Sequence, residues 1–294
     1  MMNKGHFDER TDREDLSGLS PQALEDLLRL LVLGQQQRIS SADLDGRRVW
    51  IKRYDAEPTP LSGRIHAVLS PLIPVYALRA SPKASAAQMV EREVRKMKVF
   101  REAGFETPQV LHSAAAIMVL SDQARIVQHE LDRLRLVDTL RHDRLLIEAA
   151  AVLGRAHSRG LCHGRPHPRD MFIAEGGWGF VDFEEEPEAS MPLCAAQARD
   201  VWLLFLQIST QALQPETEDR ALAAYRAEAP SGSLIGLKSI INVLSPLLPV
   251  LSLVEKVSLL GSDGRRLLSA TRFLKGTLAA TGAETETSKP VAAG

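Results

Sequence analysis

The sequence predicts an α+β protein in two parts, a first part that mixes strands with one main helix and a second part that is mostly helical. Up to about residue 131, short alternating segments surround one strongly periodic helix. From there to about residue 280, apolar residues recur mainly at helical spacing. The ends, residues 1–18 and 281–294, contain too few large apolar residues to form a core and are expected to be disordered.

The first part, residues 19–131, is expected to contain two helices and a strand before it ends in a hairpin. "QALEDLLRLLVLG" (22–34) is apolar at helical spacing, although its last residues also suit a strand. "RRVWIKRYD" (47–55) alternates between apolar and polar residues, which predicts a strand. "AAQMVEREVRKMKVFREAGFETP" (86–108) predicts a helix that stops at Gly104. Its apolar face consists of Met89, Val90, Val94, Met97 and Phe100.

The hairpin and the second part complete the expected order of elements. "AIMVL" (116–120) and "ARIVQHEL" (124–131) are expected to be the two strands of the hairpin, joined at residues 121–123. Residues 132–280 then form the mostly helical second part. Its expected elements are a helix at 145–160, a loop at 161–173, a short strand at 176–184, a buried helix at 195–209 and further helices over 211–278.

The composition is that of a soluble globular protein, and it argues against several classes of function. Hydrophobic residues make up 45% of the 294 residues, and the net charge is −1, so no overall basic field attracts nucleic acid. The two cysteines, Cys162 and Cys194, form no CxxC pair, which argues against a disulfide framework and a cysteine zinc site. The polar N-terminus does not resemble a secretory signal. We therefore expect a cytoplasmic protein that does not bind nucleic acid.

One short apolar motif occurs twice. "VLSPLIPV" (68–75) and "VLSPLLPV" (243–250) differ at a single position. The first is too short for a transmembrane helix, and the second lies in a stretch with a lysine, an asparagine and two prolines, so we expect neither to span a membrane. We favour two core segments that are alike by coincidence. Alternatively, residues 64–79 and 234–254 form apolar surfaces that touch a membrane or a hydrophobic partner.

Two charged residues of the first part have the types that phosphoryl transfer from ATP requires. That reaction needs a lysine on the phosphates and a carboxylate that orients the lysine. Lys52 lies in the predicted strand on the same face as Trp50 and Tyr54. Glu93 lies beside the buried face of the predicted helix and is the expected partner, with Glu91 as the competitor. Taken singly, each of these charges also suits an ordinary surface position.

Three aspartates of the second part supply the remaining carboxylates. Asp182 follows an apolar strand and faces the loop with Asp170, so the two side chains together suit Mg²⁺, which prefers oxygen ligands. Asp200 stands at the start of a predicted buried helix, where a carboxylate can accept hydrogen bonds from loop N–H groups. Taken singly, each aspartate also suits a turn or a helix cap.

In this order, the features resemble the protein-kinase-like superfamily. "HGRPHPRDMFI" (163–173) is similar to the "HGDLHPxNIL" loop of lipopolysaccharide-core sugar kinases, RIO-type kinases and the small kinase of the KEOPS complex. "VDFEEEP" (181–187) is similar to their "IDFE" metal motif, and "EREVRKMKVFREAGFETPQVL" (91–111) to the RIO-type and sugar-kinase helix. The resemblance covers residues 25–275. It implies a two-lobed kinase-like fold, with a small N-lobe that carries an antiparallel sheet and one main helix, and a mostly helical C-lobe.

The resemblance also implies ATP and Mg²⁺ as cofactors and assigns roles to residues. Lys52 would bind the ATP phosphates with Glu93 as its partner. Asp170 would stand where the family has a metal-binding asparagine, and Asp182 would be the principal metal ligand. The implied structural residues are His163 in the loop and Asp200 as its brace, and the implied hinge residues beside the adenine are His129, Glu130 and Leu131.

The chain departs from the family pattern at Arg165, which stands where the family has its catalytic aspartate. Arginine cannot accept a proton at pH 7, so Arg165 would either neutralise the transferring phosphoryl group or pair with Asp170 or Asp182 in place of a metal. His167 is a substitute acid–base candidate, or alternatively a loop residue that makes a hydrogen bond. No glycine-rich loop precedes Lys52, so nucleotide binding is either absent or built differently. The candidate catalytic residues are therefore Arg165, His167 and Asp170.

The insert at residues 58–84 separates Lys52 from Glu93, and it is apolar and mildly basic. Beside an active cleft, such a segment suits a sugar or glycolipid acceptor of the lipopolysaccharide type at the inner face of a membrane, or a protein partner. We therefore expect an ATP- and Mg²⁺-dependent kinase-like phosphotransferase. The alternative is a pseudokinase that regulates a partner or binds a membrane.

Overall fold

The computed structural model describes residues 19–33, 37–56, 84–123, 125–230, 232–257 and 261–287. Contacts divide these residues into two units, one that ends before Ala124 and one that begins at Arg125. The first unit holds a small antiparallel sheet, and the second is mostly helical. The predicted α+β fold class is therefore confirmed.

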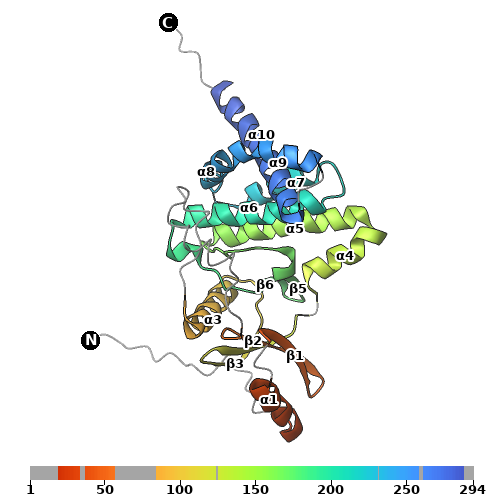
Figure 1. Cartoon of the computed structure of the whole chain (residues 1–294), viewed down its shortest axis with the longest axis vertical. Helices are drawn as coiled ribbons and strands as arrows, with labels where there is room; N and C mark the ends of the chain where they lie inside the picture. Colours follow the sequence, from red (N-terminus) through yellow and green to blue (C-terminus); the bar gives the residue numbers. More distant parts are fainter. Residues whose placement is uncertain are drawn as a thin grey trace, which may run out of the picture. The chain divides into compact units, whose positions relative to one another are not determined.

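The first unit is a four-stranded antiparallel sheet with the strand order β1-β2-β4-β3. Figure 1 shows its two helices, α1 and α3, on opposite sides of the sheet. The α1 side is an apolar core in which Ala23 and Leu27 pack with Val49, Ile51 and Val119. The elements are α1 (Pro21–Leu33), β1 (Ile39–Leu44), β2 (Arg47–Arg53), α3 (Ala86–Glu102), β3 (Val110–Ala114) and β4 (Ile117–Ser121).

Strand β2 determines which residues face which helix. Because side chains alternate along a strand, Val49 and Ile51 face the α1 core while Lys52 faces the opposite side. Helix α3 begins at a capping box in which Ser85 accepts a hydrogen bond from the backbone of Gln88 and the Gln88 side chain accepts one in return. The sequence therefore fixes Lys52 on the α3 side of the sheet.

The predicted hairpin of residues 116–120 and 124–131 is wrong in its second strand. The observed hairpin joins β3 to β4, and the chain is helical from Val127 onward as α4 (Val127–Val137). The short apolar run at 124–131 suited either structure, but Val127, Leu131 and Leu134 are buried at helical spacing and the helix prevails. Strands β1 and β3 were not predicted, because their segments, "ISSADL" and "VLHSA", are short and do not alternate strictly between apolar and polar residues. Residues 58–83 of the predicted insert lie outside the described residues.

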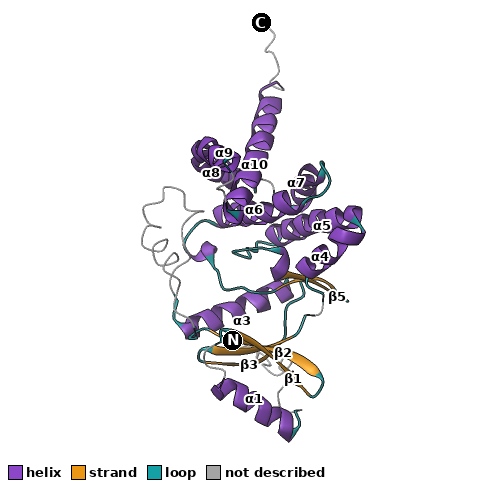
Figure 2. Cartoon of the chain, turned by 45° about the vertical axis from the view of Figure 1, so that its right-hand side comes forward, coloured by secondary structure: helices purple, strands orange, loops and turns teal. Residues whose placement is uncertain are grey.

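The second unit is built around helix α5, which packs against α4 and α7, and helix α6, which packs against α8 and α10 (Figures 1 and 2). A two-stranded antiparallel hairpin, β5–β6, forms part of the segment that connects α5 to α6. The prediction of a helical second part is correct, although strand β5 was expected to be loop. The elements are α5 (Thr139–Ser158), β5 (Met171–Ala174), β6 (Gly177–Phe180), α6 (Leu193–Gln211), α7 (Thr217–Glu228), α8 (Ile235–Leu244), α9 (Leu248–Lys256) and α10 (Ser262–Thr287).

Glycine allows two pairs of helices in this unit to approach closely. A Cβ at Gly154 of α5 would lie 2.6 Å from the carbonyl oxygen of Tyr225 in α7. A Cβ at Gly236 of α8 would lie 2.9 Å from the Cβ of Ala198 in α6. Both distances are shorter than normal contacts, so these crossings require the missing side chain.

The second copy of the repeated motif lies where α8 passes through a short 3-10 turn, Ser245–Leu247, into α9. By length and composition the stretch Ile235–Lys256 is apolar enough to cross a membrane, a test that core helices of soluble proteins also pass. Helix α8 buries four apolar residues, whereas none of the residues in the turn or in α9 is buried. The second copy is therefore partly packed and partly exposed. The first copy, residues 68–75, lies outside the described residues.

Candidate functional site

In the first unit, Lys52 and Glu93 form a buried ion pair. The Lys52 Nζ lies 3.0 Å from both carboxylate oxygens of Glu93, and the two side chains are 8% and 1% exposed. The Tyr54 hydroxyl donates a hydrogen bond to the same carboxylate, and the Lys52 Nζ lies 5.5 Å from the Tyr54 ring centroid. The competing residue, Glu91, is exposed. Strand β2 thus presents a lysine and a tyrosine to one glutamate of α3.

A buried pair of this kind holds the lysine in one place. Charges are costly to bury unless each has its partner, so the pair persists only with good geometry and further hydrogen bonds. Here the Glu93 carboxylate has both Lys52 and Tyr54 as donors. The lysine ammonium group is thereby fixed on the α3 side of the sheet with a defined orientation. That is the arrangement a phosphate-binding lysine needs.

In the second unit, Asp200 braces the loop at residues 161–170. Its carboxylate accepts hydrogen bonds from the backbone N–H of His163 at 2.7 Å and of Gly164 at 2.9 Å. It also lies near the thiol of Cys162, at 3.3 Å, and the Nε2 of His157, at 3.4 Å. Asp200 lies inside α6 rather than at its start, where the sequence had predicted it. A fully buried carboxylate with these donors fixes the path of the loop.

His163 ties the same loop to the segment after β6. Its Nε2 donates to the carbonyl oxygen of Val181 at 2.9 Å, and its Nδ1 accepts a longer hydrogen bond from the backbone N–H of Arg165, at 3.4 Å. Gly164 has a φ of +103°, and a Cβ there would lie 2.7 Å from the carbonyl oxygen of Glu185. The loop therefore lies directly against residues 181–185, and glycine is needed at the contact.

Arg165 extends from this loop to the acidic segment. One of its terminal nitrogens lies 3.2 Å from the Oδ2 of Asp182, and its Nε lies 3.9 Å from the Oε1 of Glu185. Burial alone would lower the pKa of Arg165, but the negative charges of Asp182, Glu185, Asp170 and Glu184 outweigh it and raise the pKa. The guanidinium is thus a permanent cation that pairs with the predicted principal metal ligand.

The two predicted metal ligands lie on adjoining segments of the second unit. Asp170 is buried at the end of the turn Pro168–Asp170, and its carbonyl oxygen accepts a hydrogen bond from the Val181 N–H at 2.9 Å. Asp182 is the residue after Val181, and its backbone has a left-handed conformation with φ of +66°. Both side chains are carboxylates, the type of oxygen ligand that Mg²⁺ takes. Arg165 competes for one oxygen of this donor set.

His167 is held in the loop as a neutral residue. Its Nδ1 accepts a hydrogen bond from the backbone N–H of Arg169 at 3.0 Å. Burial and the positive charges of Arg169, Arg266 and Arg165 lower the pKa of His167 to about 4. At neutral pH it is therefore uncharged and takes up a proton less readily than an ordinary histidine.

The predicted hinge residues lie in the first turns of helix α4. Leu131 is fully buried and His129 is exposed. Glu130 forms an ion pair with Arg133 at 2.9 Å. Their proposed contact with adenine stays a prediction.

Two residues at these sites were missed from the sequence. Tyr54 contacts Glu93, and the alternation that placed Lys52 on its face also placed Tyr54 there, so the signal was present. Arg199 donates to the carbonyl oxygen of Gly164 and to the carboxylate of Glu185. It stands next to Asp200 in the motif "ARDVW", but nothing in the sequence indicated which carboxylate it would contact.

No protein-family profile and no curated protein matches the chain. Among solved structures, the chain is similar to MAP kinase LmaMPK10 from Leishmania major, at 16% identity over 87% of each chain, with a TM-score of 0.34. It is also similar to Rv3197 from Mycobacterium tuberculosis, solved with erythromycin, at 15% identity over 87% of this chain and 81% of that chain, with a TM-score of 0.35. A third structure, the Rio2 kinase–ADP/Mg²⁺-phosphoaspartate complex from Chaetomium thermophilum, has 14% identity over 85% and 75% of the two chains, with a TM-score of 0.35. At these identities and TM-scores, the functional argument rests on the residues of the two units.

Proposed function

We propose that the protein is a kinase-like phosphotransferase that uses ATP. The observation that carries this proposal is the buried Lys52–Glu93 pair, with Nζ–Oε distances of 3.0 Å. A lysine whose only task was to stabilise the sheet would be exposed, because burying an ion pair gives little net stability over apolar residues of the same size. A lysine held in place by a glutamate is what binding of nucleotide phosphates requires.

The second unit supplies the residues that this reaction needs besides the lysine. Asp200 and His163 hold the loop against the segment that carries Asp182. Asp170 and Asp182 would hold Mg²⁺, which, when bound, neutralises charge on the nucleotide phosphates. Arg165 brings a fixed positive charge, so it would neutralise the transferring phosphoryl group and would not act as a base. His167, neutral and weakly basic, would serve by its hydrogen bond to the loop rather than as a strong base.

The acceptor that we propose is the hydroxyl group of a sugar or glycolipid of the lipopolysaccharide type. The support is the apolar, mildly basic sequence at residues 58–84. Such a segment suits contact with a lipid-linked glycan at the cytoplasmic face of a membrane. The exposed apolar residues of α9 are a second surface of this kind. This acceptor class rests on composition and on the resemblance to sugar kinases.

A regulatory pseudokinase is the second candidate, and the Arg165–Asp182 ion pair favours it. With its guanidinium 3.2 Å from Asp182, Arg165 replaces both the expected catalytic base and part of the charge that a metal would bring. A protein of this type would bind nucleotide without Mg²⁺, or bind none, and act through a protein partner or a membrane.

Nucleotide binding to the full chain tests the first proposal, with and without Mg²⁺. Binding of a fluorescent ATP analogue is expected to weaken strongly in Lys52→Met, and to remain in Lys98→Met, whose lysine is exposed on α3. Because Lys52→Met leaves Glu93 buried without its main partner, the double variant Lys52→Met/Glu93→Leu restores an uncharged interior and keeps the test valid if the single variant is unstable. Equal binding by all of these variants would exclude Lys52 as a nucleotide ligand.

A transfer assay then separates the two candidate functions. Transfer of the γ-phosphoryl group of ATP to a panel of sugars and lipid-linked glycans, lost in Asp182→Ala, is the result expected of a phosphotransferase. Nucleotide binding that is insensitive to Mg²⁺, together with no transfer to any member of the panel, is the result expected of a pseudokinase.

A further inference from the structure

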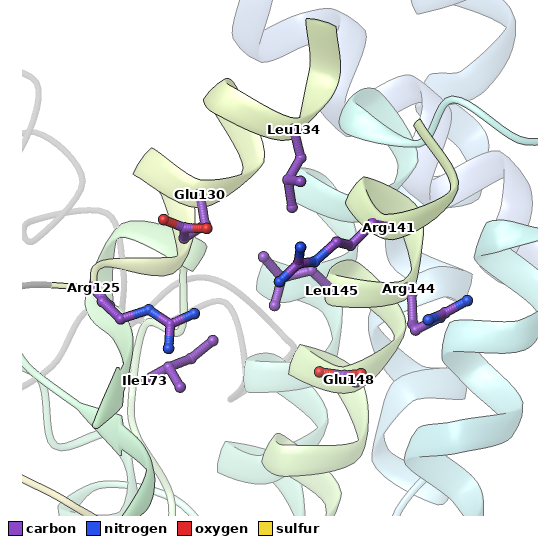
Figure 3. A pocket seen from close by; sticks show the side chains of 8 residues that line it. All are labelled: Arg125, Glu130, Leu134, Arg141, Arg144, Leu145, Glu148 and Ile173. Carbon is purple, nitrogen blue, oxygen red and sulfur yellow. The ribbon is translucent and has the colours of Figure 1, made fainter. Parts of the chain in front are cut away.

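A pocket of the second unit lies apart from the residues discussed above as the kinase-like site. It has a volume of about 220 Å³ and lies between α4, with Arg125 just before that helix, and the first half of α5, with one residue from β5 (Figure 3). We call its three apolar lining residues the floor and its five charged lining residues the rim. The lining residues are Arg125, Glu130, Leu134, Arg141, Arg144, Leu145, Glu148 and Ile173.

The rim of this pocket has more positive than negative charge available for a ligand. Arg125 and Arg141 extend toward one another from opposite sides of the pocket, as Figure 3 shows. Among the described residues, no carboxylate lies within ion-pair distance of Arg125, Arg141 or Arg144. Glu130, in contrast, is already bound to Arg133 outside the pocket, at 2.9 Å. Glu148 is therefore the acidic residue of the rim that remains to oppose the three arginines.

The pKa of Glu130 is lowered by the positive charge of two arginines of the rim, Arg125 and Arg141. A hydrogen bond from Arg133 lowers the pKa of Glu130, and the charges of Arg133, Arg125 and Arg141 lower it further. The arginines thus act on the space that the rim encloses. An anion in that space would experience the same attraction.

The position of two of these arginines is unfavourable for the helix that carries them. Arg141 and Arg144 lie in the first two turns of α5, a helix of 20 residues whose first turn contains no acidic residue. The N-terminal end of a helix carries partial positive charge, so basic residues there destabilise the helix. The Asp138 cap, which accepts a hydrogen bond from the Arg141 N–H, offsets only part of this charge. If helix stability alone determined the sequence, acidic residues would be expected in the first turn of α5.

We propose that this pocket binds the phosphate group of a small ligand. A phosphate has several oxygens and can accept hydrogen bonds from two guanidinium groups that approach from opposite sides. A carboxylate has only two oxygens, which a single arginine can occupy in the bidentate arrangement. The apolar floor of Leu134, Leu145 and Ile173 accommodates a short carbon skeleton attached to that phosphate. The site is independent of Lys52, Asp170 and Asp182, so it does not depend on the proposed phosphotransferase activity.

The phosphate group has two possible sources, a soluble phosphorylated metabolite or a phospholipid headgroup. The second is relevant because three large apolar residues at the corner between α4 and α5, the two helices that supply most of the lining, are strongly exposed. Leu136 is 88% exposed, Val137 70% and Leu140 66%. If the phosphate belongs to a lipid, these side chains would enter the membrane interface.

The experiment measures binding of inorganic pyrophosphate to the full chain by calorimetry, and in parallel cosedimentation with phosphatidylcholine vesicles that contain or lack phosphatidic acid. Arg141→Gln is expected to weaken binding about tenfold, because a hydrogen bond to a charged group is lost. Glu148→Gln is expected to strengthen it, because a competing charge is removed. Arg135→Gln, at an exposed arginine of α4 that does not line the pocket, is the matched control and is expected to leave it unchanged.

The two arms distinguish the sources of phosphate, and Lys52→Met distinguishes this site from the nucleotide site. Binding of pyrophosphate that depends on Arg141 but not on Lys52 supports a soluble ligand. Binding to phosphatidic acid vesicles that depends on Arg141 and is lost in Leu136→Ser/Leu140→Ser supports a lipid. Equal affinities of Arg141→Gln and Arg135→Gln in both arms would overturn the proposal, as would binding lost in Lys52→Met alone. All the substituted residues except Lys52 are exposed, and circular dichroism checks that the variants fold.

Discussion

The guanidinium group of Arg165 lies 3.2 Å from the Oδ2 of Asp182, and by the sequence resemblance Arg165 stands where kinase-like loops have an aspartate. The arginine has the opposite charge to the residue it replaces. An aspartate at this position would repel Asp182, whereas Arg165 attracts it. The guanidinium also binds an oxygen of Asp182 that a metal would use. Competition between Mg²⁺ and this guanidinium would distinguish the two functions proposed above.

We predict that Arg165→Ala binds Mg²⁺ about tenfold more tightly than the wild type, because a positive charge next to Asp182 is removed. Calorimetric titration with Mg²⁺ alone measures the effect. Arg155→Ala is the control, since Arg155 pairs with Glu228 instead. An unchanged affinity in Arg165→Ala would show that Asp182 is not a metal ligand in this protein.

The Lys52–Glu93 pair predicts a strongly non-additive double-mutant cycle. Lys52→Met should lower the free energy of unfolding by about 3–5 kcal/mol, because it leaves the Glu93 carboxylate buried without the positive charge of the lysine. The double variant Lys52→Met/Glu93→Leu should recover most of this loss, because no buried charge remains. Urea unfolding of the four proteins measures the coupling. Additive effects would mean that the two side chains do not interact in solution.

The sequence predicted those elements whose pattern is long or strongly periodic. Helix α3 and helix α6 follow from apolar spacing, and β2 follows from its alternation. The segment at 124–131, taken alone, suits a strand as well as a helix, and only the helical spacing that continues to Leu134 distinguishes the two. The short strands β1 and β3 depend on pairing with β2 and β4, which a local pattern does not contain.

In the candidate site, too, local patterns predicted some contacts and tertiary packing determined the others. Pairing of Lys52 with Glu93 was expected from a strand face and a helix face, which are local properties. Arg165, Asp182 and Glu185 lie in loops and Arg199 lies in α6, so the Arg165–Asp182 and Arg199–Glu185 contacts depend on the paths of the loops. Several carboxylates stood within reach of each arginine in the sequence, and only tertiary packing selected among them.

Asp200→Asn is predicted to destabilise the protein by about 2–4 kcal/mol, because an amide nitrogen would replace an oxygen that now faces the N–H groups of His163 and Gly164. Hydrogen exchange of these two amides should become faster than in the wild type. Asp219→Asn, at an exposed residue of α7, is the control. Unchanged protection of both amides in Asp200→Asn would contradict the bracing role.

His167 predicts a specific loss of stability in acid. Its pKa in the folded protein is about 4, below the ordinary value of 6.5, so the unfolded chain binds a proton that the folded protein does not. Stability should therefore fall as the pH decreases from about 6.5 to about 4. In His167→Asn, whose side-chain oxygen can still accept from the Arg169 N–H, this part of the pH dependence should disappear. Urea unfolding at a series of pH values tests it, and identical slopes for both proteins would exclude His167 as the cause.

Replacement of glycine by alanine should have opposite effects on stability at two positions, one in the contact of α5 with α7 and one on the surface of α10. Gly154→Ala should destabilise the protein by about 1–3 kcal/mol, because the new methyl group would lie 2.6 Å from the Tyr225 carbonyl oxygen and 3.0 Å from the Glu228 Cβ. Gly276→Ala, in the exposed part of α10 with no atom within 4 Å of the new Cβ, should stabilise it by about 0.5–1 kcal/mol, because alanine favours the helix. Thermal unfolding of both variants measures the difference. If Gly154→Ala were as stable as the wild type, α5 and α7 would be able to separate without cost, and the close packing between them would not contribute to the stability of the second unit.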